Sequence, residues 1–399
     1  MENISPTELE ALLDEATHPD PLRAREGSRA LFTGLVEPMA DRFEPALCPI
    51  YAEIFSRAIE RVFPELKSAA LVERYHRIRE PRPCRRGAEC VVVLSRVTLG
   101  ADVAITSVVL DAVKRRFPRA RIVFAGPRKA WELFETDARL SWLPVDYGRG
   151  ATLAERLSVR EVLVRELSQK SSIVVDPDSR LTQLGLVPVC PEESYYFFES
   201  RSYGGDGDEP LVELAARWVR EIFDIDGARP YIAPRAFPAE GPRISISLGV
   251  GENLAKRVPD PFEEDLVRGL LGLGMPLLID RGAGGEERER VDRAIARSGA
   301  GPEQIETWEG AFAPFAARIA RSRLYVGYDS AGQHVAAACG VPLVSVFAGS
   351  VSERMFARWR PTGPGPTSVV RADNRDPSSV LAGVLAAATR LGAIPTRQL

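Results

Sequence analysis

The sequence lacks features that would each point to a particular class of protein. It contains no run of about 18 apolar residues, which a membrane-spanning helix requires. Its N-terminus, MENISPTELEALLDEA, is acidic and has no basic segment followed by an apolar block, so it does not resemble a secretory signal. A cytoplasmic location is therefore expected.

Cysteine and net charge are both low. The five cysteines are odd in number and scattered without a C-x-x-C pair, which argues against a disulfide framework and against a zinc site. A formal net charge of -3 leaves no broad basic surface to neutralise phosphates, so nucleic acid is not an expected partner. The composition, 45% hydrophobic and 27% charged, is that of a globular protein, and 399 residues favour two domains over one.

Residues 1–88 predict helices without strands. Ser5 can cap the first helix, Pro6 suits its first position, and Glu8 can complete a capping box. The segment PIYAEIFSRAIERVF carries apolar residues at helical spacing, so one face of that helix must pack on another part of the chain. We interpret these residues as a helical extension.

Five arginines lie between Arg77 and Arg86, within HRIREPRPCRRGAE, where prolines interrupt regular structure. One interpretation is a solvated linker. The other is a patch that meets an anionic acceptor or a membrane surface. Both interpretations remain open at this point.

From Cys90 onward, short β-branched runs alternate with helical periods, which predicts parallel α/β architecture. The runs CVVVLSRV, RARIVFAG, LSWLPVD and SSIVVD are the expected strands of a first domain over residues 89–235. The proline-rich GARPYIAPRAFPAEGP is the expected linker. A second α/β domain over residues 241–390 contains the expected strands RISISLGVG, MPLLIDR, RLYVGYD and PLVSVF. Ligands of such folds bind at the carboxyl ends of the strands.

Small residues follow the expected strand RLYVGYD. Asp329 ends the strand, and SAGQHVAAACG supplies a turn and a short helix. The free N–H groups and the dipole at a helix N-terminus favour phosphate, and Ser330 and His334 can add a hydroxyl and a ring N–H. The alternative is that Asp329 and Ser330 only cap the helix, while His334 is a packing residue.

The string D-S-A-G-Q-H, followed by A-A-A-C-G-V-P-L-V-S-V-F-A-G, resembles the C-terminal motif of glycosyltransferase family 9, the ADP-heptose:lipopolysaccharide heptosyltransferase family. The resemblance covers roughly residues 90 to 390 and leaves the helical extension outside. It implies a GT-B fold, in which two Rossmann-like domains face a cleft, and inversion of the sugar without a metal ion. It also implies that the diphosphate of the donor is held by Asp329, Ser330, Ala331, Gly332 and His334.

Two further segments are similar to donor-binding parts of the family. SLGVGENLAKRVPDPF resembles its strand, glycine-rich loop and K-x-W-P segment, which implies that Lys256 contacts the diphosphate; Val258 replaces the usual tryptophan. LLIDRGAGGEERERV resembles the segment whose glutamate contacts the ribose or base, and either Glu286 or Glu287 can be that glutamate. A surface lysine and an ordinary acidic first helical turn are the alternatives.

The segment LSRVTLGADVAITSVVLDAVKRRFPRARI looks like the family's N-terminal pattern R-x-S-x-x-G-D. The resemblance makes Asp102 the candidate catalytic base, which would take the proton from the attacking acceptor hydroxyl; an N-cap is the alternative role. Both glycines of the family motifs are displaced, because Gly100 lies one place before the expected position and Gly332 one place after it. These departures suggest a divergent branch.

The D-x-D sequence formed by Asp176 and Asp178 has the form of a metal motif found in another class of glycosyltransferase. A lone D-x-D is a weak signal, and the resemblance to family 9 puts it on the acceptor side, so neither a metal nor a cofactor is expected. Lys114, Arg180 and Arg201 lie in or near loops on the same side and can meet an acidic acceptor, although only their charge suggests it.

The resemblance therefore predicts a cytoplasmic, inverting glycosyltransferase of lipopolysaccharide biosynthesis. It would move a heptose or another sugar from a nucleotide diphosphate, ADP in the family, to a glycan or lipid-linked acceptor, with peripheral contact with the inner face of the membrane. Two alternatives remain open. One is a nucleotide-sugar epimerase on the same fold. The other is a non-catalytic protein that binds nucleotide sugars or serves as a scaffold, in which the displaced glycines mark lost catalysis.

Overall fold

The computed structural model describes residues 5–85, 87–148, 150–167, 172–236, 243–251, 254–282, 284–373 and 376–392. The contacts divide the chain into two compact units. Unit 1 comprises Met1–Thr98, Val108–Trp131 and Ala138–Ala228, whereas unit 2 comprises Leu99–Ser107, Glu132–Asp137 and Arg229–Leu399. The expected helical extension and most of the expected first domain thus fall together in unit 1.

The chain begins with helices, as the sequence predicts. They are α1 (Pro6–Ala16), α2 (Pro21–Leu31), α3 (Glu37–Asp41), α4 (Leu47–Val62) and α5 (Ser68–Ile78), with a π-helical turn at Phe32–Val36. The capping box is confirmed, because the Glu8 amide donates to Ser5 Oγ at 3.2 Å and the Ser5 amide donates to Glu8 Oε2 at 2.8 Å. No strand lies among residues 5–85.

Unit 1 contains a parallel sheet of five strands in the order β3-β2-β1-β4-β5. The strands are β1 (Cys90–Leu94), β2 (Arg121–Gly126), β3 (Leu140–Pro144), β4 (Ser172–Asp176) and β5 (Tyr195–Phe197). Every residue of β1 and β4 is buried, which explains their nearly continuous apolar runs, because a parallel sheet is covered on both faces. The first four strands are confirmed predictions, and β5 was not predicted.

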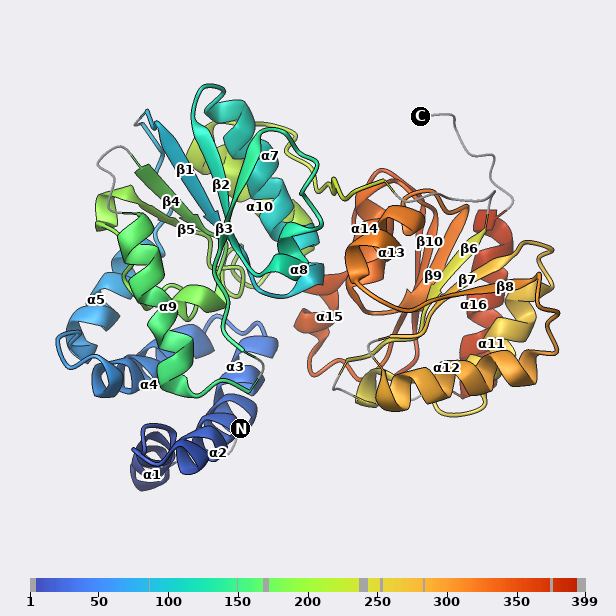
Figure 1. Ribbon diagram of the computed structural model, residues 1–399, viewed down its shortest axis with the longest axis horizontal. Helices are drawn as coiled ribbons and strands as arrows, with labels where there is room; N and C mark the ends of the chain where they lie inside the picture. The colour runs from blue at the N-terminus through green and yellow to red at the C-terminus, as the bar shows by residue number, and fades with distance from the viewer. Residues whose placement is uncertain are drawn as a thin grey trace. The chain divides into compact units, whose positions relative to one another are not determined.

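Helices cover both faces of this sheet. The helices from β1 onward are α6 (Leu99–Ala101), a π-helical turn (Asp102–Thr106), α7 (Ser107–Arg116), α8 (Arg128–Trp131), α9 (Leu153–Glu166) and α10 (Leu211–Phe223), of which α6 and the π-helical turn belong to unit 2 by their contacts. On one face, buried residues of α9 and of the N-terminal helices form one apolar core with β1, β2 and β4. Figure 1 shows α7 and α10 against the other face. The N-terminal helices are thus built into the core of unit 1.

Unit 2 contains a parallel sheet of six strands in the order β11-β10-β9-β6-β7-β8. The strands are β6 (Ile244–Ser247), β7 (Leu277–Asp280), β8 (Ile305–Trp308), β9 (Leu324–Tyr328), β10 (Leu343–Phe347) and β11 (Thr367–Arg371). The helices are α11 (Phe262–Leu271), α12 (Gly285–Ser298), α13 (Phe312–Ile319), α14 (Ala331–Ala338), α15 (Glu353–Trp359) and α16 (Pro377–Gly392). One face packs on α11, α12 and α16, and Figure 1 shows α13 and α14 on the other.

The strand order of each sheet reverses once, between β1 and β4 in unit 1 and between β6 and β9 in unit 2. Ligands of open parallel sheets bind outside the carboxyl ends of the strands at this switch point. The loops that follow these four strands are therefore where a site is expected. Among the described residues, no helix is long and apolar enough to span a membrane.

Candidate functional site

Lys256 and Asp329 form an ion pair at the carboxyl edge of the second sheet. Lys256 ends a short 3-10 turn (Leu254–Lys256) in the loop after β6, and Asp329 directly follows β9. The Lys256 Nζ lies 2.8 Å from Asp329 Oδ2, and the two side chains are 20% and 11% exposed. An ammonium group has three N–H donors, so this contact fixes the lysine in place without using all of them. The structure thus brings together two of the predicted diphosphate-binding residues.

The N-terminus of α14 begins beside this ion pair. Ser330 occupies the N-cap position, but its side chain makes no capping hydrogen bond and instead lies 3.4 Å from the Tyr325 hydroxyl. The Asp329 carboxylate accepts from the Lys256 ammonium and from the side-chain amide of Gln333. Neither predicted residue therefore uses its side chain to cap the helix, and the first backbone N–H groups of α14 keep the positive end of the helix dipole.

His334 lies in the first turns of α14 and is buried, with 5% of its surface exposed. Its ring packs 5.6 Å from that of Trp359, and its Nε2 lies 3.3 Å from the Gln333 amide nitrogen. Burial lowers the pKa of His334 from 6.5 to about 4. The negative charge of Asp329 offsets part of this shift, whereas the positive charge of Lys256 adds to it. A neutral imidazole carries one N–H, so His334 can donate a single ring hydrogen bond at neutral pH.

The side chain of Tyr325 explains the position of the glycine in the D-S-A-G-Q-H segment. This buried tyrosine of β9 packs against the start of α14, and a Cβ on Gly332 would lie 2.3 Å from its hydroxyl oxygen. A Cβ on Gly327 would lie 2.6 Å from the same hydroxyl oxygen. Ala331 is only partly buried and can carry its methyl group. The ring of Tyr325 therefore requires the glycine one residue later than the family pattern does.

The structure separates the two candidate glutamates in the first turn of α12. Glu286 is exposed, whereas Glu287 is half-buried against the loops that follow β6 and β7. A Cβ on Gly249 or on Gly282 would lie 2.4 Å from Glu287 Oε1. Burial and the neighbouring Asp280 raise the pKa of Glu287. Of the two, Glu287 is thus the one that lies at the carboxyl edge of the sheet.

Asp102, the predicted base, is wholly buried in the π-helical turn after α6, and its Oδ1 accepts from the Thr106 hydroxyl at 2.7 Å. The helix begins at Leu99, three residues earlier, so Asp102 is not an N-cap. Leu99–Ser107 belongs to unit 2 by its contacts, where a Cβ on Gly100 would lie 3.3 Å from both Ala331 Cα and His334 Cδ2. The segment that carries Asp102, the predicted base, thus lies in space beside the start of α14, the predicted phosphate-binding helix.

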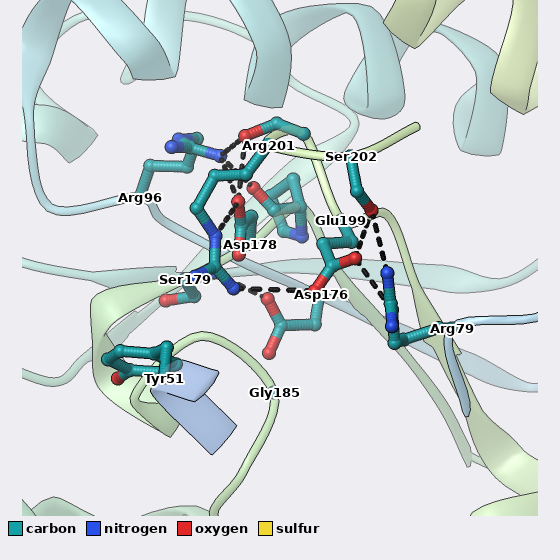
Figure 2. Close-up of polar contacts among 12 residues, drawn as sticks. Tyr51, Arg79, Arg96, Asp176, Asp178, Ser179, Gly185, Glu199, Arg201 and Ser202 are labelled. Atoms are coloured by element: carbon teal, nitrogen blue, oxygen red, sulfur yellow. Dashed lines mark hydrogen bonds and ion pairs between the residues drawn. The ribbon is translucent and has the colours of Figure 1, made fainter. Parts of the chain in front are cut away.

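The D-x-D aspartates are buried and bound within unit 1 (Figure 2). Asp176 accepts from the hydroxyls of Thr182 and Tyr195, and burial raises its pKa to about 6. Asp178 accepts from Ser200 and Arg201. Both carboxylates serve the internal packing of loops. In the part of the chain that the structure describes, no group of His, Cys, Asp and Glu side chains could hold a metal ion.

Two arginines of the arginine-rich segment before β1 contact the chain around β5, and Arg86 lies outside the described residues. Arg77 pairs with Glu192 through two hydrogen bonds at 3.0 Å, and Arg82 donates to the Tyr195 carbonyl at 2.9 Å while lying over the Tyr196 ring. These side chains fasten the end of the helical segment to the start of β5. Charge alone did not distinguish this role, because each partner lies more than a hundred residues away.

A cavity of about 470 Å³ beside Lys256 was not anticipated. It is lined by Ala255, by residues 257–259 and 348–350, by Ser352 and Glu353, and by residues 371–373. Gly349 has a φ of +62°, and a Cβ there would lie 2.2 Å from the Ala255 carbonyl oxygen. Arg371 lines it as well and pairs with Glu353 at 2.7 Å. The sequence signal was Gly349 itself, two residues after the end of the predicted strand PLVSVF.

Comparison with known proteins bears on this site. The family model of glycosyltransferase family 9 (heptosyltransferase) matches residues 309–377, which include α14 and its flanking strands. The resemblance to glycosyltransferase family 9 is confirmed. Among the predicted site residues, Asp329 to His334 lie in the segment that matches family 9, whereas Asp102, Lys256 and Glu287 lie outside it. None of the curated proteins searched matches the chain.

Solved structures of a family 9 glycosyl transferase and of heptosyltransferases share the fold. A family 9 glycosyl transferase from Veillonella parvula is 18% identical with a TM-score of 0.57, covering 78% of this chain and 99% of that chain. ADP-heptose lps heptosyltransferase II of E. coli is 16% identical with a TM-score of 0.50, covering 76% and 99%. E. coli heptosyltransferase WaaC with ADP-2-deoxy-2-fluoro heptose is 15% identical with a TM-score of 0.53, covering 75% and 98%.

These identities establish the fold rather than the substrate. The two parallel sheets with flanking helices are GT-B-like, as predicted. This fold and the match to the family 9 model together support glycosyltransferase activity.

Proposed function

We propose that the protein is an inverting glycosyltransferase. It transfers a sugar from a nucleotide diphosphate to a glycan or lipid-linked acceptor, and it uses no metal ion. The observation that carries this proposal is the contact between Lys256 and Asp329 at the uncapped start of α14, within and beside the segment that matches family 9. A fixed ammonium beside a helix N-terminus offers a diphosphate both charge and hydrogen-bond donors.

On the donor side, the diphosphate lies at the N-terminus of α14. Its oxygens accept from Lys256, from the Ser330 hydroxyl and from the N–H groups of Ala331 and Gly332, and a neutral His334 adds one ring N–H. Glu287 contacts the nucleoside, because it is the glutamate at the sheet edge, whereas Glu286 is exposed. The family resemblance favours adenine as the base and a heptose-like sugar.

The transfer itself needs one proton acceptor and one stabilised leaving group. Asp102 takes the proton from the acceptor hydroxyl as that oxygen bonds to the anomeric carbon. The bond between this carbon and the diphosphate oxygen breaks on the opposite face, so the configuration inverts. The departing diphosphate gains a negative charge, which Lys256 and the dipole of α14 stabilise.

One observation favours a second candidate function. Asp102 is wholly buried and already accepts from Thr106, which is the expected state of a carboxylate with a structural role. The second candidate is therefore a protein that binds the nucleotide sugar without transferring it. The two candidates predict the same donor site and differ only in the role of Asp102.

The donor site is tested by measuring the binding of ADP, GDP, UDP and CDP through thermal shift and calorimetry. One nucleotide should raise the unfolding temperature of the wild type, because a ligand that binds only the folded state stabilises it. Lys256→Ala should weaken its binding by about 10- to 100-fold, the value of a charge-assisted hydrogen bond. Lys67→Ala is the control, since Lys67 pairs with Glu60 at 3.2 Å in the helical segment. Equal binding by Lys256→Ala would contradict the donor site.

The transfer step is tested with Asp102→Asn. Asparagine keeps an oxygen for Thr106 but cannot take a proton, so nucleotide affinity should stay unchanged while transfer falls by about 100-fold or more. Transfer is followed with a panel of alkyl glycosides and glycolipids as acceptors. Full transfer by this variant would exclude Asp102 as the base, and nucleotide binding without transfer by the wild type would favour the non-catalytic candidate.

A further inference from the structure

Three loops meet at the switch point of the first sheet, within unit 1. They follow β1, β4 and β5 and comprise residues 95–98, 177–185 and 199–202. Figure 2 shows that charged side chains of these loops point toward one another. Since the carboxyl ends of strands at a switch point are where open parallel sheets bind ligands, the conformation of these loops matters for binding.

A buried ionic network ties the three loops together. Arg201 donates from Nε to Asp178 at 3.3 Å and from Nη2 to Glu199 at 3.5 Å, and all three residues are buried. Asp178 also accepts from the Ser200 hydroxyl at 2.7 Å. Arg96 donates to the same hydroxyl at 2.8 Å. Each loop is thus held by a side chain from another loop.

The loops adopt a backbone conformation that is unfavourable for their residues. Val97 has a φ of +73°, Asp178 of +66°, Gln183 of +49° and Leu184 of +57°. A non-glycine residue in this region costs about 1–3 kcal/mol and persists only when its surroundings impose it. The contacts around these residues must therefore hold the loops in this conformation.

Helices α4 and α5 supply these holding contacts. The Tyr51 hydroxyl donates to the Gln183 carbonyl at 3.2 Å, and Arg74 donates to the Gly185 carbonyl at 2.7 Å. Both acceptors are backbone atoms of the strained loop after β4. The Tyr51 ring also lies under the Arg201 guanidinium, 5.0 Å from its Cζ.

Helix α5 and its C-cap residue Arg79 also hold the loop after β5. The Tyr75 hydroxyl donates to Glu199 Oε1, and Arg79 donates to Glu199 Oε2 at 2.7 Å and to the Ser202 hydroxyl at 3.2 Å. Glu199 is therefore shared between α5 and Arg201. Removing the Arg79 charge leaves a buried carboxylate with one cation fewer, which is costly in an interior of low polarity.

We propose that α4 and α5 form a positioning element for the acceptor-binding edge of unit 1. Through Tyr51, Arg74, Tyr75 and Arg79, these helices keep the loops after β4 and β5 in their strained conformation, and through Arg201 and Asp178 they keep Arg96 in place. The proposal gives a function to the helical segment that the family resemblance leaves out. It rests on the proposed function in assigning the acceptor to unit 1.

The test compares Arg79→Met with a matched control and a conservative rescue. The control is Arg61→Met, because Arg61 of α4 is 25% exposed, close to the 21% of Arg79, and pairs with Glu10 and Asp14 of α1, away from the loops. Arg79→Lys restores the charge. Hydrogen exchange is followed at Leu184, whose amide donates to the Ser179 carbonyl at 2.8 Å, and at Ser202 and Tyr203, whose amides donate to the Glu199 carbonyl.

We expect loop exchange in Arg79→Met to be about 10-fold faster than in wild type, with partial recovery in Arg79→Lys and no change in Arg61→Met. In transfer assays with alkyl glycosides as acceptors, Arg79→Met should raise the acceptor KM by about 10-fold, while kcat and the donor KM stay within about twofold. Nucleotide affinity should match that of wild type.

Three results would overturn the proposal: unchanged loop exchange in Arg79→Met, equal acceleration in Arg61→Met, or an effect on the donor KM in place of the acceptor KM. Failure of the proposed function has a different signature, namely a wild-type protein that binds no nucleotide and transfers no sugar. Loop exchange then still decides whether the helices hold the loops.

Discussion

The burial of His334 makes a quantitative prediction about stability and pH. Its ring is 5% exposed between Trp359 and the start of α14. Protonation in the folded protein would create a positive charge without water and close to the ammonium of Lys256, and the carboxylate of Asp329 offsets this only in part. The folded protein therefore resists protonation of His334, whereas the unfolded chain does not.

The magnitude follows from the two pKa values. A pKa of about 4 in the folded protein, against 6.5 in the unfolded chain, corresponds to about 3 kcal/mol in full. Between these values the unfolded chain binds more protons, so stability is greatest above pH 6.5 and falls as the pH drops toward 4. About 2 kcal/mol of this loss should occur between pH 7 and pH 5.

The assay is urea unfolding of wild type and His334→Gln at pH 7 and at pH 5. Carboxylates that titrate over this range contribute to both proteins, so the difference between the two pH responses isolates His334. The wild type should lose about 2 kcal/mol more than the variant. His76→Gln is the control, because His76 is exposed on α5.

Equal pH responses in wild type and His334→Gln would refute this reasoning, because they would mean that His334 titrates in the folded protein as it does in the unfolded chain. A steeper response in the variant would refute it as well. In the first case the folded protein would expose His334 to solvent as the unfolded chain does, and in the second it would favour the protonated ring over the neutral one.

Two further predictions concern the second sheet. Gly349→Ala should cost about 1–3 kcal/mol more than Gly251→Ala in urea unfolding, because both glycines have a φ of +62° but only a Cβ on Gly349 would meet the Ala255 carbonyl; equal costs would show that this loop can move. Glu287→Gln should weaken nucleotide binding by about 10-fold in calorimetry, whereas Glu286→Gln should change it by less than about twofold, since only Glu287 lies at the sheet edge. The reverse order would exchange their roles.

Local patterns were sufficient to predict most of the fold. Runs such as CVVVL and SIVVD are buried on both faces and are therefore mostly apolar, which makes them recognisable from the sequence alone. The strands β5, β8 and β11 were missed. The first has three residues, and the other two are edge strands without a buried residue, so none presents a buried apolar run of ordinary length.

The site was predictable where the chemistry is local and not where it depends on distant partners. The start of α14 and the glycine-rich loop after β6 each carry their own signal, and the structure places Lys256 beside Asp329. The role of Arg79 was not visible, because its partner Glu199 lies 120 residues away. The choice between Glu286 and Glu287 likewise required knowing which side of α12 faces the sheet.

The packing of Tyr325 has a consequence for recognising distant relatives of this protein. A search pattern that demands glycine directly after Ser330 would reject this chain, although a glycine follows one residue later, at Gly332. The residue that must be small is the one beneath the aromatic ring, and its position along the chain changes when the ring leans toward the next residue. We expect distant relatives to be recognised better by two features together than by either alone. These features are an aromatic residue in the strand and a glycine that lies one position later.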